Sequence, residues 1–300
     1  MYAILGANGH TGRIVAKTLL ARGQEVRVVG RNPEHLERFT AHGAQAAAAD
    51  ATDAAALSQA FQGADSVYVL LPPDPTSSDY RGYQARVTDA IVAAIKHAGV
   101  KNAVVLSSIG ADKPSGTGPV LGLFNLEQKL NQVPDLNALY LRAGYFMENT
   151  LPQAAVVRHA GAMIGPLRGD LKVSMIASRD IGQAAADALL RLDFHGKQVR
   201  ELQGHRDLDY NQAAEIIGKA IAQPTLKYVH ASDDQIRPAL VQMGMSENMV
   251  GLLLEMTAAM NSGHMKALEA RTTANTTPTS FEAFVNEQFV AAYQQQQKAA

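Results

Sequence analysis

The sequence predicts an α/β fold, with a doubly wound parallel sheet covered by helices on both faces and a smaller, mostly helical C-terminal part. Short apolar segments alternate with longer amphipathic segments as far as Leu202. A glycine-rich turn joins the first apolar segment to the first amphipathic one, and Pro72 and Pro73 follow a later apolar segment directly. Because strands that alternate with helices form parallel sheets with right-handed crossovers, this stretch is expected to form one layered unit.

Residues 1–30 are expected to form a strand, a helix and a second strand. Residues 2–5 are apolar, and the glycine-rich turn follows them directly. The helix then has an apolar face at the spacing of helical turns, formed by Ile14, Val15, Leu19 and Leu20. Gly23 ends this helix, and residues 26–29 form the second strand, which closes at Gly30 and Arg31.

The same alternation continues along the chain. Asn32 is expected to cap a helix with Pro33 at its first position, where the missing N–H costs nothing, and Gly43 stops this helix. The further predicted strands are 45–49, 66–71, 103–107, 138–142 and 198–202, and the further predicted helices are 52–61, 80–98, 121–131 and 181–190.

After Tyr145 the pattern loosens, which predicts two parts. Residues 1–150 and about 173–205 are expected to form the dinucleotide-binding part, and about 151–172 and 206–300 a smaller substrate-side part. Two segments have the spacing of capping boxes, Ser232 with Gln235 and Thr279 with Glu282. Five methionines in the smaller part have a spacing typical of a helix core, with a substrate pocket or an interface as the alternatives: Met243, Met245, Met249, Met256 and Met260.

The composition excludes several classes of function. The formal net charge is −1, and we find no basic patch, so no nucleic-acid partner is expected. There is no cysteine, which excludes disulfides, thiolate metal ligands and thiol nucleophiles, and the nine histidines follow no metal-ligand spacing. The first predicted strand begins at Tyr2, and no apolar run reaches the roughly 18 residues of a membrane span. We therefore expect a cytoplasmic protein without a metal or a membrane partner.

The glycine-rich turn predicts a Rossmann fold that binds a dinucleotide. Gly6, Gly9 and Gly12 have the spacing G-x-x-G-x-x-G between a predicted strand and a predicted helix. The first glycine allows the tight turn, the second lets the backbone approach a pyrophosphate, and the third lets the helix pack on the strand. The N–H groups at the start of that helix favour an anion, so Asn8, His10 and Thr11 are also expected to contact the cofactor.

The end of the second predicted strand indicates which dinucleotide is bound. Proteins that prefer NAD usually carry Asp or Glu about 20 residues after the turn, whereas this strand ends in Gly30 and Arg31. A guanidinium at this place can bind a 2′-phosphate through two hydrogen bonds. NADP(H) is therefore the expected cofactor, with a solvated arginine at a strand end as the alternative for Arg31.

Other candidates follow the carboxyl ends of the predicted strands, where such sheets hold ligands. Asp50 is a candidate partner of the adenine amine or a helix cap. Leu71, Pro72 and Pro73 are expected to pack against the nicotinamide side. Ser107 and Ser108 are expected to hydrogen-bond the cofactor or the substrate, although serines also cap loops.

The motifs in this order resemble those of the NmrA-like group of atypical short-chain dehydrogenases/reductases, over nearly the whole chain. The segments that carry the resemblance, besides the glycine-rich turn, are Gly30-Arg31-Asn32-Pro33, Ser107-Ser108-Ile109-Gly110-Ala111, residues 141–149 and Ser178-Arg179-Asp180-Ile181-Gly182. The resemblance implies NADP(H) bound along the first turn, with contacts from Arg31, Asp50 and residues 71–73. It also implies that Tyr145 and Phe146 lie near the nicotinamide.

The chain departs from catalytic short-chain dehydrogenases at the proton donor. None of its nine tyrosines is followed four residues later by lysine, so alcohol–ketone chemistry is disfavoured. Where the resemblance would place a lysine, four residues before Glu127, the chain has Leu123, and the role is not transferred to the nearby Lys129.

Two functions remain open from the sequence. The first is an NADPH-dependent oxidoreductase that reduces a quinone-like or other conjugated acceptor, for which Tyr145 and Ser108 are the candidate catalytic residues. Such an acceptor delocalises the charge that hydride adds, so it needs little acid catalysis. The second is a non-catalytic NADP(H)-binding redox sensor that controls a protein partner. The partners considered are a small-molecule acceptor, a second copy of the chain and a regulatory protein.

Overall fold

The computed structural model describes the backbone of residues 1–298 and the side chains of residues 1–295. Its centre is a seven-stranded sheet in the order β10-β6-β5-β4-β1-β2-β3, in which every neighbouring pair is parallel. The doubly wound parallel sheet predicted from the sequence is confirmed. Its strands are β1 (Tyr2–Leu5), β2 (Val26–Gly30), β3 (Gln45–Ala48), β4 (Ser66–Val69), β5 (Asn102–Ser108), β6 (Asn137–Ala143) and β10 (Lys197–Leu202).

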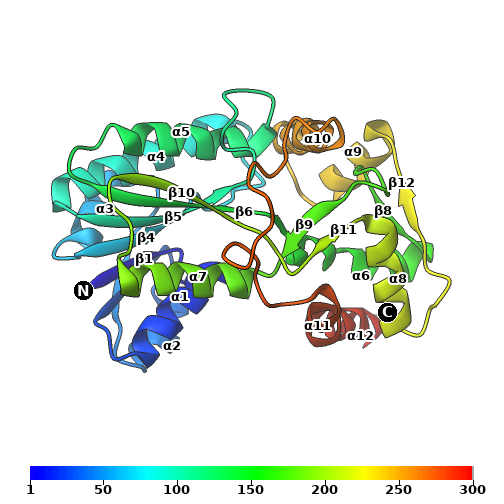
Figure 1. Ribbon diagram of the computed structural model, residues 1–300, viewed down its shortest axis with the longest axis horizontal. Helices are drawn as coiled ribbons and strands as arrows, with labels where there is room; N and C mark the ends of the chain where they lie inside the picture. The colour runs from blue at the N-terminus through cyan, green and yellow to red at the C-terminus, as the bar shows by residue number, and fades with distance from the viewer. Residues whose placement is uncertain (299–300) are drawn as a thin grey trace.

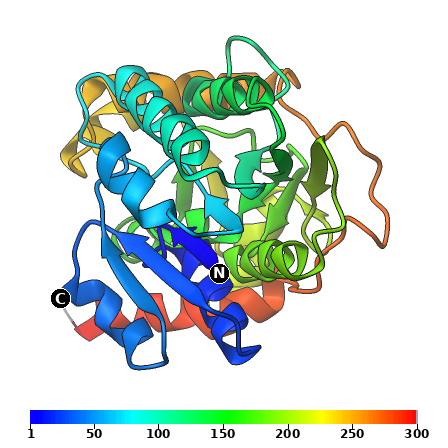
Figure 2. The same cartoon turned by 90° about the vertical axis from the view of Figure 1, so that its left-hand side faces the viewer.

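Helices cover both faces of this sheet, and the sheet is seen between the two helix layers in Figure 2. In Figure 1, α4 and α5 lie above the sheet, and α1, α2 and α7 lie below it. One apolar core joins the upper face to α3, α4 and α5, and a second joins the lower face to α1, α2 and α7. The helices are α1 (His10–Ala21), the 3₁₀ turn Glu34–Leu36 with α2 (Glu37–Thr40), α3 (Ala54–Phe61), α4 (Tyr80–Ala98), α5 (Leu121–Asn131) and α7 (Ser178–Arg191).

The strand order positions a ligand crevice. β1 pairs with β2 on one side, where Tyr2 lies beside Val26, and with β4 on the other, where Tyr2 lies beside Ser66. The chain therefore winds in one direction from β1 to β3 and in the other from β4 to β10. At such a switch point the crossovers leave a crevice outside the carboxyl ends of the strands, which is where open α/β sheets bind ligands.

Two small sheets lie beyond the large one. β7 (Tyr145–Phe146), β9 (Val173–Ile176) and β11 (Asp207–Leu208) form the first, and β8 (Met163–Gly165) and β12 (Tyr228–His230) form the second. β7 follows β6 after a single residue, and β9 comes directly before α7, so the first small sheet lies where the two predicted parts meet. The boundary between those parts therefore remains a prediction.

Helices and short turns complete the smaller part, on the right in Figure 1. Its core contains the apolar residues of α8 (Tyr210–Ala220) and a second group from the C-terminal helices. The residues of this second group are at most 1% exposed: Phe281, Phe284, Val285 and Phe289. The remaining elements of the described chain are η2 (Gly118–Val120), η3 (Met147–Thr150), α6 (Gln153–Ala160), α8 (Tyr210–Ala220), α9 (Asp233–Gln242), α10 (Glu247–Asn261), α11 (Phe281–Phe284), the π-helical turn Val285–Phe289 and α12 (Val290–Lys298). Within the described chain, no helix has both the length and the apolar character of a membrane span.

A strap, residues 262–280, connects α10 to α11 and crosses the middle of the molecule in Figure 1. The strap is fixed to the end of β10. The N–H of Gln203 donates to the Asn275 carbonyl at 2.7 Å, and the N–H of Thr277 donates to the Gln203 carbonyl at 2.9 Å. The buried Glu201 carboxylate accepts from the N–H groups of Leu268 and Glu269.

Two predicted details are wrong and one is confirmed. β4 ends at Val69 and not at Leu71, because its pairing with β5 ends at Val69. Thr279 is not a helix cap. The cap of α11 is Ser280, whose hydroxyl accepts from the Ala283 N–H at 3.1 Å, while Thr279 donates to the buried Asp180 at 2.7 Å. The capping box of Ser232 and Gln235 is confirmed.

Candidate functional site

Two positions of the glycine-rich turn, Gly6 and Gly12, have a backbone geometry that requires glycine. Gly6 has φ of 71°, a left-handed conformation that residues with a Cβ rarely adopt. A Cβ on Gly12 would lie 2.3 Å from the Gly6 carbonyl oxygen, which no side chain can tolerate. The Gly9 N–H donates to that same carbonyl at 2.9 Å and closes the turn. The turn therefore brings the start of α1 directly against the end of β1.

The start of α1 is open to an anion. Gly9 precedes the helix in an extended conformation, and within the described chain no side chain caps the first turn. The first N–H groups of a helix have no partner inside it and carry partial positive charge, so His10, Thr11 and Gly12 present amides suited to a phosphate. The Thr11 hydroxyl accepts from the buried Tyr68 phenol at 2.8 Å. Thr11 is thus turned toward the core, and its N–H is the group suited to an anion.

Two arginines lie at the end of β2. Arg31, which the sequence analysis proposes as a contact of a 2′-phosphate or as a solvated arginine, is exposed. Arg38, from α2, donates to the Asn8 amide oxygen at 2.9 Å and so lies beside the glycine turn. Arg38 could not be identified from the sequence, because its place beside Asn8 depends on how α2 folds back against Gly30. The Leu36 side chain is placed 3.3 Å from a Cβ built on Gly30.

Asp50 lies close to this cationic edge. Its carboxylate accepts from the Thr52 hydroxyl at 2.6 Å and from the Thr52 N–H at 2.8 Å. These two hydrogen bonds lower the pKa of Asp50, and the charge of Arg31 lowers it further. The same arginine is close enough to act on the pKa of Tyr83 in α4, which burial raises. Asp50 is therefore an ionised, exposed group that both closes a turn and faces the edge where Arg31 lies.

The segment after β4 forms the next part of this edge. Leu71 and Pro72 are half-buried, and Pro73 is exposed. The preceding Leu70 is placed 3.2 Å from a Cβ built on Gly6, so this segment lies against the glycine turn. The three predicted residues thus lie where the crevice begins.

A cleft of about 440 Å³ continues from the carboxyl ends of β5 and β6 to the strap and α10. Its apolar lining comes from Ile109, Leu171, Val173, Met256, Met260 and Met265. Its polar lining includes Ser108, Tyr145, Lys172, Ser174, Asp207 and Lys266. The methionine stripe is therefore split: Met249 is buried, Met243 is exposed, and Met256 and Met260 line the cleft. Methionine side chains can adapt to flat ligands of different outline.

Tyr145 joins this cleft to the core of the smaller part. It is half-buried in β7, and its phenol oxygen accepts a hydrogen bond from the Tyr210 hydroxyl at 3.0 Å. Burial raises the pKa of Tyr145, and hydrogen bonds from Tyr210 and Asn149 partly oppose that rise. Tyr145 is therefore protonated at neutral pH. Phe146, the next residue, packs instead against the apolar core below the sheet and is not among the residues that line the cleft in the described chain.

The two serines at the end of β5 point to different environments, as successive strand residues do. Ser108 lines the cleft, and its hydroxyl donates to the Ile109 carbonyl at 2.9 Å. The Ser107 hydroxyl donates to the buried Glu127 carboxylate at 2.6 Å. Glu127 also accepts from the Arg142 guanidinium at 2.6 and 3.1 Å. The Ser107 hydroxyl therefore donates to this buried network, and a hydrogen bond between Ser107 and a ligand stays a prediction.

The structure shows where Leu123 and Lys129 lie, the two positions at which the sequence analysis looked for a lysine. Leu123 packs in a small apolar cluster with Met256 and Met260 behind the cleft. Lys129 forms an exposed ion pair with Asp89 on the outer side of α5. Neither position supplies a lysine to Tyr145. No group of three or more potential metal ligands occurs among residues 1–298.

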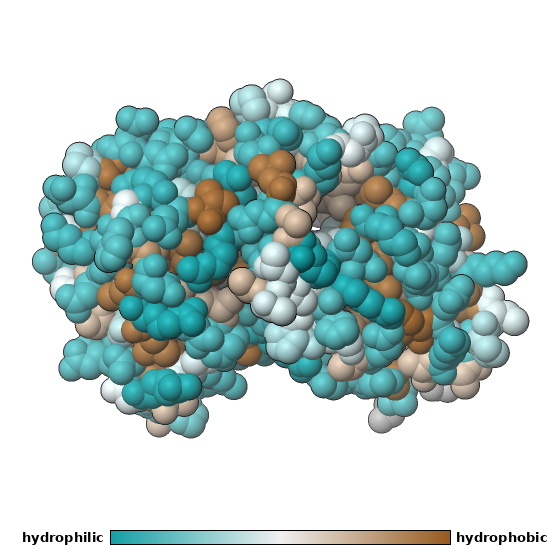
Figure 3. All heavy atoms as spheres, in the orientation of Figure 1, coloured by the Kyte–Doolittle hydropathy of each residue, from teal (hydrophilic) through white to brown (hydrophobic). Residues whose placement is uncertain are grey.

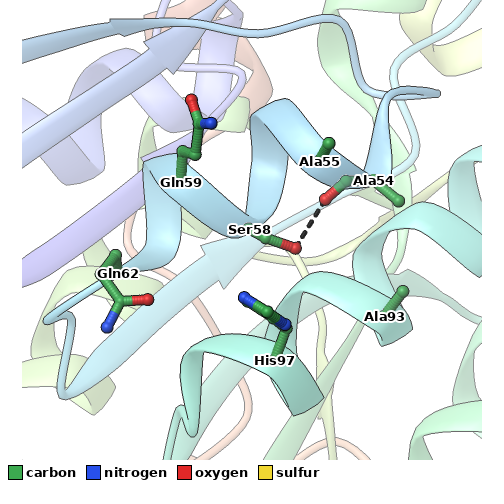
Figure 4. A pocket seen from close by; sticks show the side chains of 7 residues that line it. All are labelled: Ala54, Ala55, Ser58, Gln59, Gln62, Ala93 and His97. Carbon is green, nitrogen blue, oxygen red and sulfur yellow. Dashed lines mark hydrogen bonds between the residues drawn. The ribbon is translucent and has the colours of Figure 1, made fainter.

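A second hollow, of about 730 Å³, lies between α3 and α4 and is drawn in Figure 4. Alanines and glutamines form much of its lining, and the Ser58 hydroxyl donates to the Ala54 carbonyl within the same helix at 2.6 Å. Among the described residues that line it, His97 is the only ionisable side chain. This hollow lies on a helix-covered face and not at the strand ends, so the cleft at β5 and β6 is the better candidate site.

The switch-point crevice, the glycine turn and the open start of α1 define a dinucleotide-binding α/β protein. Residues 2–285 match the model of the NmrA-like family, and the chain belongs to that family. Over 260 residues the chain is 30% identical to an NAD(P)H azoreductase of Xenophilus azovorans, with 86% of each chain covered. Over 269 residues it is 29% identical to quinone oxidoreductase 2 of Escherichia coli, with 88% of this chain and 89% of that protein covered.

A solved structure shares the whole architecture. The crystal structure of NADPH-dependent quinone oxidoreductase QOR2 from Escherichia coli, complexed with NADPH, superposes with a TM-score of 0.82. The two chains are 26% identical, and the match covers 96% of this chain and all of that one. The Rossmann fold class predicted from the sequence is thereby confirmed.

Proposed function

We propose that this protein is an NADPH-dependent oxidoreductase that reduces a quinone-like or other conjugated small-molecule acceptor. One observation carries the proposal: an apolar cleft, lined by Tyr145 and Ser108, lies at the same sheet edge as a glycine turn shaped for a dinucleotide. Two relatives with assigned activities, an NAD(P)H azoreductase and quinone oxidoreductase 2, support the same class of reaction.

The residues present fit NADP(H). Gly12 lies close to Gly6 and has no side chain, so the backbone at the start of α1 is not covered by one. A pyrophosphate would have room there and N–H groups to bind. Arg31 and Arg38 supply two guanidinium groups near the end of β2 for the 2′-phosphate, a group that distinguishes NADPH from NADH. Asp50 would accept from the adenine amine, and residues 71–73 would cover the nicotinamide side.

When bound, the cofactor supplies a hydride, so that a quinone takes up that hydride and one proton and leaves as the hydroquinone. The protein orients the acceptor and hydrogen-bonds its oxygen. Tyr145 is suited to this because its phenol is protonated at neutral pH and its oxygen is held by Tyr210. Ser108 lies in the same cleft and supplies a second hydroxyl.

The absence of a Tyr-x-x-x-Lys pair is consistent with this acceptor class. A ketone needs a proton at the oxygen as the hydride arrives, whereas a quinone spreads the new charge over its conjugated system. Positioning in the cleft with a few hydrogen bonds is then sufficient. Met256 and Met260 provide an apolar surface against which a flat ring can pack.

The proposal is tested by two measurements on the full chain. The first titrates NADPH and follows the quenching of nicotinamide fluorescence, and the second adds 1,4-naphthoquinone and follows oxidation of the reduced cofactor. We expect tight NADPH binding and quinone-dependent oxidation. Ser58→Ala, in the hollow between α3 and α4, is the matched control and should behave as the unmodified protein. Tight binding without turnover of any conjugated acceptor would favour the non-catalytic redox sensor, and no binding would overturn the assignment.

A further inference from the structure

The charged side chains of the cleft do not balance one another. Lys172, Asp207 and Lys266 line it. The Lys172 ammonium lies 2.7 Å from the Asp209 carboxylate, and Asp207 forms an ion pair with Arg271. Within the described residues, Lys266 has no carboxylate at ion-pair distance, although the other two charges of the lining are each neutralised by a neighbour. The cleft therefore keeps one uncompensated positive charge at its edge.

Lys266 belongs to the strap, and the strap is fixed by hydrogen bonds on both sides of this residue. On one side, the Met265 N–H donates to the Ala259 carbonyl of α10 at 3.0 Å. The Met265 side chain packs against Gly110, two residues after Ser108, where a built Cβ would lie 2.6 Å from the methionine methyl carbon. On the other side, the Leu268 N–H donates to the buried Glu201 carboxylate at 3.0 Å. The backbone position of Lys266 is thus fixed relative to the cleft.

The surroundings of Lys266 define a ligand with two different ends. Met256, Met260 and Met265 form an apolar wall of the same cleft, which suits a flat conjugated ring. Lys266 is exposed, and an ammonium without a partner beside that wall favours a negative charge on the ring, because opposite charges attract. A neutral or cationic ring would leave this charge unmatched.

We propose that Lys266 selects conjugated acceptors that carry an anionic substituent, such as a carboxylate or a sulfonate. This inference rests on the proposed function, because it concerns the acceptor side of the same cleft. Lys266 is a specificity residue that contacts the substituent, while Tyr145 and Ser108 face the part of the ring that is reduced. A contact of this kind changes the affinity for the acceptor and leaves the hydride step itself unchanged.

The experiment compares two 1,4-naphthoquinones that differ only in one group on the distal ring, a carboxylate or the neutral carboxamide. Binding of each is measured to the protein saturated with NADP⁺, which cannot reduce the quinone, and turnover is measured separately with NADPH. We expect the unmodified protein to bind the carboxylate about three- to fivefold more tightly than the carboxamide, as for a partly exposed ion pair. This preference should shrink as the salt concentration rises.

Charge reversal at Lys266 provides the decisive comparison. Lys266→Glu should reverse the preference, so that the carboxamide binds more tightly than the carboxylate. Lys101→Glu makes the same change of net charge at the opposite end of β5 and should keep the original preference. Equal affinities of the unmodified protein for both quinones, or the same loss of preference in Lys101→Glu, would overturn the inference. Because the binding measurement needs no turnover, a failure of the proposed reaction would be seen separately, as absent oxidation of NADPH.

Discussion

Tyr210 donates a hydrogen bond to the phenol oxygen of Tyr145 over 3.0 Å, which links the core of the smaller part to the cleft. Tyr210 is itself buried and packs against Tyr228 with ring centroids 4.7 Å apart. The Tyr228 hydroxyl in turn donates to the Leu167 carbonyl at 2.8 Å. Since Tyr145 accepts from Tyr210, its own proton is free to be donated to a ligand. Tyr210 is therefore a positioning residue for Tyr145.

This relationship predicts graded effects of removing each hydroxyl. Tyr145→Phe should lower kcat with a naphthoquinone about tenfold, since one hydrogen bond to the acceptor oxygen is lost. Tyr210→Phe should lower kcat only about two- to threefold, because Tyr145 keeps its hydroxyl and loses its orientation. Tyr228→Phe is the control, with a hydroxyl bonded to Leu167 instead. Steady-state kinetics at saturating NADPH measure the series, and an unchanged kcat in Tyr145→Phe would remove Tyr145 from the catalytic role.

The pKa of Tyr145 predicts the alkaline side of the pH profile. Burial raises this pKa above the ordinary value of 10.0, so the phenol loses its proton only at a higher pH than a free tyrosine does. We expect kcat/KM to show no loss attributable to Tyr145 up to about pH 10. The measurement compares the profiles of the unmodified protein and Tyr145→Phe. An alkaline decrease centred well below pH 10 that disappears in Tyr145→Phe would contradict the prediction.

Gly12→Ala should strongly weaken NADPH binding. The new Cβ would lie 2.3 Å from the Gly6 carbonyl oxygen, so the start of α1 must move away from β1 and carry its N–H groups with it. Fluorescence titration should show at least a hundredfold weaker binding, equivalent to about 2.7 kcal/mol. Gly251→Ala is the matched control, because a Cβ there meets no atom within 4 Å. Gly251→Ala should bind NADPH normally and gain about 0.5–1 kcal/mol of stability from its helical position.

The two arginines beside the end of β2 should set the preference for NADPH over NADH. Arg31→Ala and Arg38→Ala should each weaken NADPH binding about tenfold or more, as expected for a lost charge-assisted hydrogen bond to a phosphate. NADH, which has no 2′-phosphate, should bind each variant as it binds the unmodified protein. Arg22→Ala, an exposed arginine at the other end of α1, is the control. A parallel loss for both dinucleotides would show that the arginines support the fold and not the phosphate.

Glu127 should contribute strongly to the free energy of unfolding. Its carboxylate is 2% exposed and accepts from Ser107 and Arg142, so Glu127→Ala leaves a guanidinium with little solvent and no partner carboxylate. Breaking one side of a buried ion pair costs roughly 3–5 kcal/mol of unfolding free energy. Asp89→Ala in α4 breaks the exposed ion pair with Lys129, which lies on α5 as Glu127 does. This change should cost less than about 1 kcal/mol of unfolding free energy. Urea unfolding measures both, and equal losses would contradict this ranking.

The sequence predicted those elements that depend on local pattern. α4 and α5 have the predicted bounds, because amphipathic spacing and a following glycine or polar residue are local signals. The order of strands and helices was sufficient to predict the parallel sheet, and the glycine spacing was sufficient to predict the turn. The error at Thr279 arose because a distant carboxylate, Asp180, determines the local structure, and the error at Leu71 arose because the pairing with β5 decides where β4 ends.

By itself, the sequence determined the Rossmann fold and the position of the glycine turn, because both follow from residues that are neighbours along the chain. Only the tertiary structure decided the cleft, because its lining comes from β5, β7, β9, α10 and the strap. The hydrogen bonds of Arg38 to Asn8 and of Tyr210 to Tyr145 join residues far apart in sequence, for which no local spacing is required. The place of Lys266 in the cleft likewise depends on where the strap lies. The chain order fixes which strands meet at the crevice, whereas side-chain packing across the two parts fixes what the crevice presents to a ligand.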